Sequence, residues 1–155
     1  MRTAARAGDA GAMPEQHTKQ IVRRFVDEYQ TGGDRQAFAE LMHPELVDHS
    51  RPPGIAEGPE GVRQQFDLFR AAFSGFRATI DEQVAEGDLV VTRKRFHGVH
   101  DGDFLGVPPT GREVEIAVID IVRVRDGRIA EHWNVVDRLG LLEQLGALPA
   151  PAGAA

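Results

Sequence analysis

A single carboxylate interrupts an apolar strand pattern in the second half of the chain. In the segment Glu113–Arg125, the even-numbered residues are all valine or isoleucine except Asp120. Alternate residues of a strand point to the same face, so Asp120 is predicted to point into the apolar interior or into a cavity. An ionised carboxylate there must find partners or take up a proton, and either outcome makes a tuned acid or base. The alternatives are a buried hydrogen-bond acceptor without a catalytic role, or a bulge that turns Asp120 to solvent.

The following strand, Arg128–Val136, carries the polar groups that can join this carboxylate. A three-residue loop ending at Gly127 places Asp120 opposite His132 and also brings the amide of Asn134 nearby. A two-residue loop shifts the pairing by one residue and places Asp120 opposite Trp133. The apolar pattern leaves both registers open, and a histidine on such a strand is also compatible with a purely structural role.

Other polar and aromatic residues are candidates for the lining of a pocket. His49 follows a short strand that we expect around residues 46–49, and His100 lies near the end of another strand. The spacing of the histidines at 97 and 100 sometimes holds a metal, but no third ligand is evident, so we predict no metal site. The candidate substrate-binding residues are His49, Phe69, Phe96, His100, Phe104 and Trp133.

The composition describes one acidic globular domain. The chain has 155 residues, 41% hydrophobic and 27% charged, with a net charge of −6 and its basic residues scattered, so nucleic acid and acidic membranes are not expected partners. It has no cysteine, which excludes disulfides and thiolate chemistry, and a cytoplasmic location fits best. No apolar run resembles a signal or a membrane span. We expect residues 1–13 to be a disordered leader, 14–148 the domain and 149–155 a flexible tail.

The hydrophobic periodicity predicts helices first and strands afterwards, which is typical of an α+β fold. Apolar residues recur with helical spacing after Pro14, after Asp34, and from Val62 to Phe73. Apolar alternation predicts strands, with the hairpin turns at Gly87 and Gly127. The expected strands are 76–84, 89–97, 113–125 and 128–136, and a closing helix is expected over 137–145.

Two stretches of the sequence are recognisable. The run HDGDFLGVPPTGREVEI and the later run DGRIAEHWNVVDRLGLLEQLG resemble the SnoaL-like polyketide cyclase family of the nuclear transport factor 2-like superfamily, and the likeness extends over residues 17–148. The resemblance implies a cone-shaped fold, in which a curved antiparallel or mixed sheet and three or four helices enclose one deep pocket. It also implies homodimers or homotetramers formed through the outer sheet face, and catalysis without metal or organic cofactor.

In cyclases of this family, a pocket aspartate removes a proton next to a carbonyl and a nearby histidine assists. The resemblance places Asn134 at the position of that aspartate and Asp120 at the position of that histidine. A carboxamide cannot remove the proton, although its NH2 group can stabilise a developing oxyanion. An exchange of roles keeps the chemistry: Asp120 acts as the base, His132 relays protons and Asn134 binds the oxygen. Asp137 is either a second carboxylate or the cap of the closing helix.

Three functions follow from these residues. The leading hypothesis is a cofactor-free cyclase that closes or rearranges a ring in a small natural product by acid/base catalysis. The second is an epoxide-opening cyclase or hydrolase, with Asp120, Asp137 and Asn134 as its polar set. The third is a non-catalytic ligand-binding or assembly module, because fold alone does not fix function.

Overall fold

The computed structural model describes residues 14–148, and the predicted leader and tail lie outside this range. In this range, four α-helices and one π-helical segment accompany a five-stranded sheet. The elements are α1 Glu15–Arg24, η1 Phe25–Thr31, α2 Arg35–Leu41, β1 Met42–Asp48, α3 Gly58–Ala72, β2 Phe73–Glu86, β3 Leu89–His100, β4 Glu113–Arg125, β5 Arg128–Val136 and α4 Arg138–Gln144. The predicted α+β class is therefore confirmed, and the predicted bounds of β4 and β5 agree with the structure.

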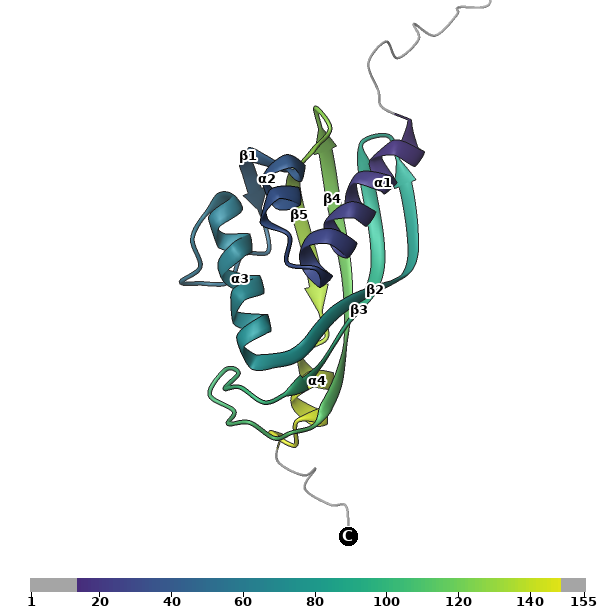
Figure 1. Cartoon of the computed structure of the whole chain (residues 1–155). Coiled ribbons are helices and arrows are strands. Elements are labelled where there is room, and N and C mark those ends of the chain that lie inside the picture. The colour runs from purple at the N-terminus through teal and green to yellow at the C-terminus, as the bar shows by residue number, and fades with distance from the viewer. Residues whose placement is uncertain (1–13, 149–155) are drawn as a thin grey trace, which may run out of the picture.

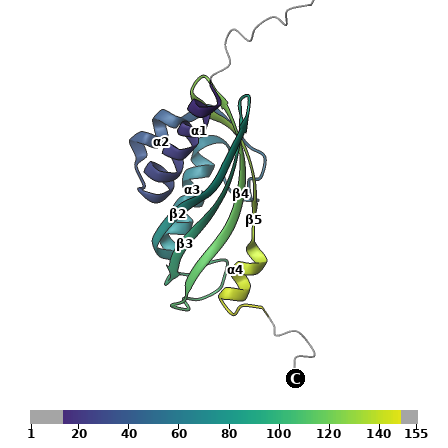
Figure 2. The same cartoon turned by 90° about the vertical axis from the view of Figure 1, so that its right-hand side faces the viewer.

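The sheet is mixed and curved, with strand order β1-β5-β4-β3-β2. Its first strand, β1, runs parallel to β5, and all other neighbours are antiparallel. Helices α1, α2 and α3 lie on one side of the sheet, whereas α4 lies at one end of it (Figures 1 and 2). The core and the site therefore lie between the helices and the inner face of the sheet.

The N-terminal helix changes its winding halfway along. Apolar residues of α1 face the sheet, and the chain then continues as the π-helical segment η1. The wider turn buries the neighbouring side chains of Tyr29 and Gln30 together, each with 2% exposure. A π-turn accommodates one extra residue in a helix, which rotates the residues that follow it. The polar Gln30 is thereby placed inside the domain.

Helix α3 provides the aromatic wall opposite the sheet. It begins at Gly58 with a proline in its first turn, where the missing N–H costs nothing, and it ends where β2 begins. Phe66 is buried and its ring contacts those of Phe69 and Phe96 at centroid distances of 6.1 and 5.9 Å. These contacts join the helix to β3 across the interior.

The hairpin between β4 and β5 has a register that sequence reasoning did not anticipate. Asp126 and Gly127 have φ of 51° and 71°, which suits a two-residue turn, and Val124 pairs with Ile129. The register then shifts, because Ala130 forms a bulge before Glu131 pairs with the residue at 123. The predicted two-residue loop is therefore confirmed, but the bulge makes the pairing predicted for Asp120 wrong in both registers: Asp120 lies opposite Asn134, and His132 is its diagonal neighbour on the same inner face.

Candidate active site

The interior contains a largely apolar cavity with one polar end. Its volume is about 550 Å³, within the range of pockets that hold small organic molecules. Phe66, Phe69, Phe96 and Phe104 contribute to its apolar wall. The polar end is formed by Gln30, Asp48, Lys94, Asp120, His132 and Asn134.

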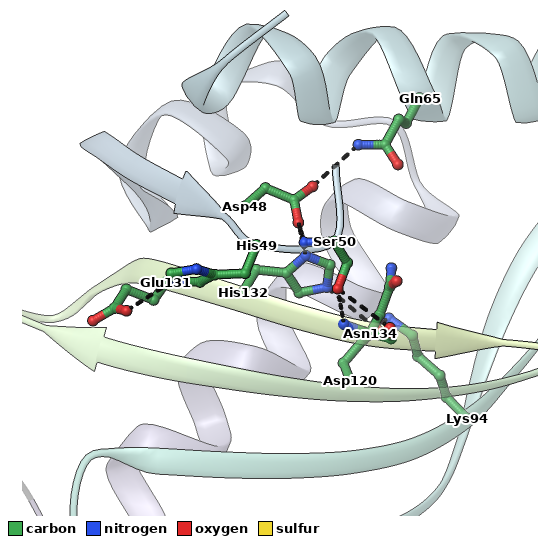
Figure 3. Close-up of polar contacts among 9 residues, drawn as sticks. All are labelled: Asp48, His49, Ser50, Gln65, Lys94, Asp120, Glu131, His132 and Asn134. Carbon is green, nitrogen blue, oxygen red and sulfur yellow. Dashed lines mark hydrogen bonds and ion pairs between the residues drawn. The ribbon is translucent and has the colours of Figure 1, made fainter. Parts of the chain in front are cut away.

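Asp120 is the centre of the polar end (Figure 3). Its side chain is 6% exposed and forms a close ion pair with the ammonium of Lys94, which is 1% exposed. Its other oxygen, Oδ1, lies 3.4 Å from Nε2 of His132. Burial alone would raise the pKa of Asp120, but the positive charge of Lys94 and the contact with His132 outweigh it and lower the pKa to about 2. The predicted inward carboxylate is confirmed, and it is ionised.

His132 lies between two carboxylates. Its Nδ1 is 3.1 Å from Oδ1 of Asp48, and its Nε2 faces Asp120. Burial would lower the pKa of His132, but the hydrogen bonds and charges of Asp120 and Asp48 outweigh burial and raise it to about 9. At neutral pH the ring is therefore an imidazolium that can donate a proton.

Asp48 is held by the strand and by α3 together. It is the last residue of β1 and pairs with His132 in the parallel register. Its carboxylate also accepts from the backbone N–H of Ser50 at 3.0 Å and from Nε2 of Gln65 at 3.3 Å. Burial raises the pKa of Asp48, but the hydrogen bond from His132 contributes to a net lowering. Asp48 is thus a second anion behind the imidazolium.

Asn134 faces the cavity directly opposite Asp120. Its backbone N–H donates to Oγ of Ser50 at 2.8 Å, and the same hydroxyl donates to its carbonyl oxygen at 3.3 Å. These two bonds continue the contact between β1 and β5 beyond the end of β1 and fix the backbone of Asn134. The carboxamide is therefore positioned beside the Asp120–His132 pair.

Several predicted site residues lie elsewhere. His49 and Trp133 are not among the cavity-lining residues, and their rings stack on each other at 4.5 Å. The His49 ring also contacts the carboxylate of Glu131 (Figure 3). His132 and Asn134 point inward, so Trp133 between them points to the outer face of the sheet. His100 is fully buried and does not line the cavity; its Nδ1 contacts Oγ1 of Thr110 at 3.0 Å, within the GVPPTGR motif. The predicted aromatic residues Phe69, Phe96 and Phe104 do line the cavity.

Asp137 acts as the N-cap of α4. Its Oδ1 accepts the backbone N–H of Gly140 at 2.8 Å, and Asp137 is not among the cavity-lining residues. We expect Asp137→Ala to lower the free energy of unfolding by about 1 kcal/mol, while Asp137→Ser retains the cap and most of the stability. Denaturant unfolding measures both. A large loss of turnover in the folded Asp137→Ser protein would contradict this assignment.

Lys94 was missed by the sequence analysis, although a signal was present. It shares its phase in β3 with the buried residues Val90, Thr92 and Phe96, whereas its neighbours Arg93 and Arg95 point outward. Period-two counting would have placed a second charge on the inner face.

In residues 14–148, no cluster of three or more histidine or acidic side chains forms a metal-binding group, and no helix is long and apolar enough to span a membrane.

The domain combines a curved sheet with a buried acid/base cluster at the end of an apolar pocket, an arrangement suited to an enzyme that acts on small molecules. Residues 20–145 match the SnoaL-like polyketide cyclases, and the chain belongs to this family. It is 34% identical over 142 residues to the aklanonic acid methyl ester cyclase DnrD of Streptomyces peucetius, covering 86% of this chain and 94% of that protein.

Solved structures agree with this membership. TsrD from Streptomyces laurentii superimposes with a TM-score of 0.79 at 34% identity, covering 88% of this chain and 99% of TsrD. Wild-type IdmH from Streptomyces antibioticus gives a TM-score of 0.75 at 36% identity, covering 83% of this chain and 98% of IdmH. The chain is therefore a small-molecule cyclase of the natural-product type.

Proposed function

We propose that this cyclase closes a carbocyclic ring of a polyketide by an intramolecular aldol reaction that needs no cofactor. The observation that carries the proposal is the juxtaposition at the end of an apolar cavity of Asp120, which is ion-paired with Lys94, of His132, which lies between two carboxylates, and of the amide of Asn134. A base and an acid on neighbouring strands are the two groups that such a reaction requires.

The proposed steps conserve protons. Asp120 removes a proton from a carbon next to a carbonyl, and this carbon attacks a second carbonyl carbon as its C=O π bond breaks. His132 donates its proton to the resulting alkoxide, while the amide of Asn134 hydrogen-bonds the developing charge. The proton on Asp120 then returns to Nε2 of His132 across their 3.4 Å contact. The product is an isomer of the substrate, and the enzyme returns to its starting state.

The weak basicity of Asp120 narrows the class of substrate. A carboxylate with a pKa of about 2 is a poor base, so it suits only a carbon acid that is already activated. A carbon between two carbonyl groups fulfils this requirement. The relative DnrD is named for the methyl ester of aklanonic acid, which makes that ester a suitable first probe.

The test follows conversion of aklanonic acid methyl ester by the unmodified protein and by Asp120→Asn. We expect the protein to cyclise the ester, and Asp120→Asn to lower kcat about 100-fold while binding measured by calorimetry stays within a few-fold. Asp120→Asn also removes the counterion of Lys94, so its folding is checked by circular dichroism. Tight binding without turnover in the unmodified protein would support a non-catalytic module and contradict the proposal.

Isotope labels separate the aldol route from epoxide opening. In D2O, an enolate route exchanges deuterium into the activated carbon of recovered substrate faster than in a control without enzyme, and no oxygen from water enters the product. Epoxide hydrolysis would instead place oxygen-18 from labelled water in a diol. Epoxide opening would need two carboxylates. Asp137 caps α4, so in this structure they would be Asp48 and Asp120, which lie on either side of His132.

A further inference from the structure

The two oxygens of Asp120 have unequal partners. Oδ2 forms a close ion pair with Nζ of Lys94, whereas Oδ1 lies 3.4 Å from Nε2 of His132. A charge-assisted N–H···O bond is normally about 2.7–2.9 Å long, so the contact with His132 is weak for a pair of opposite charges. The carboxylate is therefore held more closely by Lys94 than by the imidazolium.

Lys94 is itself held in place. Its Nζ donates to Oε1 of Gln30 at 2.9 Å, and it lies 5.1 Å from the centre of the Phe96 ring. With 1% of its side chain exposed, it cannot exchange Asp120 for water. Gln30 occupies this position because of the π-helical turn of η1. The contacts that hold the Asp120 carboxylate thus run from β4 through Lys94 of β3 to Gln30 of η1.

This arrangement leaves one N–H of His132 weakly bound. Its Nδ1–H donates to Asp48 at 3.1 Å, but among residues 14–148 the Nε2–H has only the distant Oδ1 of Asp120 as a partner. His132 is 19% exposed and lines the cavity, so a substrate oxygen has access to it. The charged groups around His132 are Asp48 from β1, Lys94 from β3 and Asp120 from β4, with Arg138 of α4 lining the same cavity.

We propose that Lys94 is a positioning residue that holds Asp120 back from His132, so that the Nε2–H stays available to the substrate and Oδ1 stays available to the migrating proton. The inference rests on the proposed acid/base function of this pair. Without Lys94, Asp120 would close on Nε2, and the acid and the base would neutralise each other in one short ion pair.

Two substitutions, a structure and a pH profile test the proposal. Lys94→Met removes the ammonium group. Lys94→Gln removes the charge but retains a hydrogen-bond donor, so it can be used for the same measurements if the methionine variant folds poorly. In a crystal structure of either variant, we expect the distance from Oδ1 of Asp120 to Nε2 of His132 to fall from 3.4 Å to about 2.8 Å. The Nε2 proton should move downfield in NMR spectra of the ligand-free protein.

The kinetic expectation is a loss of kcat with substrate binding retained. We expect kcat on aklanonic acid methyl ester to fall about 10- to 100-fold and KM to change less than threefold. The alkaline limb of the pH profile should move upward, because the imidazolium loses a nearby positive charge and gains a closer anion. The matched control is Arg93→Met, which removes one cation from the outer face of the same strand, where Arg93 contacts Glu82. It should leave the limb in place.

An unchanged distance of 3.4 Å together with an unmoved alkaline limb in folded Lys94→Gln would overturn the proposal, whatever the effect on rate. The structural and NMR results do not depend on turnover. If the unmodified protein converts no probe, the proposed function fails, but the distance and the proton shift still decide the role of Lys94.

Discussion

Replacing His132 by glutamine is expected to lower kcat by about 100-fold or more, because the variant lacks the proton donor of the proposed cyclisation. Glutamine retains a hydrogen-bond donor and similar bulk, so the cavity and substrate binding should be largely preserved. Conversion of aklanonic acid methyl ester by the folded variant measures the effect. His17→Gln on the exposed surface of α1 is the matched control and should retain the activity of the unmodified protein.

The pH dependence of kcat tests whether His132 is the proton donor. With the pKa of His132 raised to about 9, kcat should be constant through neutral pH and fall as the imidazolium loses its proton above that value. With the pKa of Asp120 lowered to about 2, no acid limb should appear between pH 4 and 8. The alkaline limb should be absent from the residual activity of His132→Gln. An alkaline limb that persists in this variant would assign the titration to another group.

Removing Lys94 alone is expected to lower the free energy of unfolding by up to about 3–5 kcal/mol, because the buried carboxylate of Asp120 loses its principal counterion and keeps only the imidazolium of His132 as a partner. Lys94→Met keeps most of the apolar stem, so the loss reports the charge rather than the packing. The double substitution Lys94→Met/Asp120→Asn should recover at least half of this loss, since it removes both charges. Urea unfolding of the single and double variants at pH 7 measures the coupling.

The sign of the pH effect is a further check on the same pair. A carboxylate with a lowered pKa contributes stability above its unfolded value of 3.8, and this is lost as the pH falls through about 2. In Lys94→Met the part of this contribution that comes from Lys94 is gone, and His132 is the remaining counterion of Asp120. The difference in unfolding free energy between the unmodified protein and the variant should therefore be smaller at pH 2 than at pH 4. Equal differences at both pH values would contradict the assignment.

Regular periodicity predicted much of this molecule. The alternation along residues 113–125 placed Asp120 on the inner face, and the spacing of Phe66 and Phe69 placed the aromatic wall on one side of a helix. These patterns follow directly from the geometry of strands and helices. The GVPPTGR motif resembles the family in sequence alone, and it lies within the residues that match the family.

Irregular geometry limited the prediction of the site. The bulge at Ala130 changed which residue faces Asp120, and a bulge is set by local twist and packing rather than by the apolar pattern. The parallel pairing of β1 with β5, which brings Asp48 to His132, joins residues far apart in the chain. Sequence reasoning likewise placed Trp133 and His49 at the pocket, because it could not fix the register that turns them outward.

The π-helical turn of η1 and the β-bulge in β5 both position residues of the polar cluster around Asp120, one from the helices and the other from the sheet. The π-turn of η1 places Gln30 where it contacts Lys94, and the bulge at Ala130 places His132 and Asn134 beside Asp120. Each depends on one additional residue in an otherwise regular element. A relative lacking a single codon at either place would retain the scaffold but present different side chains to the cavity, so chemistry in this fold can diverge by small insertions and deletions as well as by substitution.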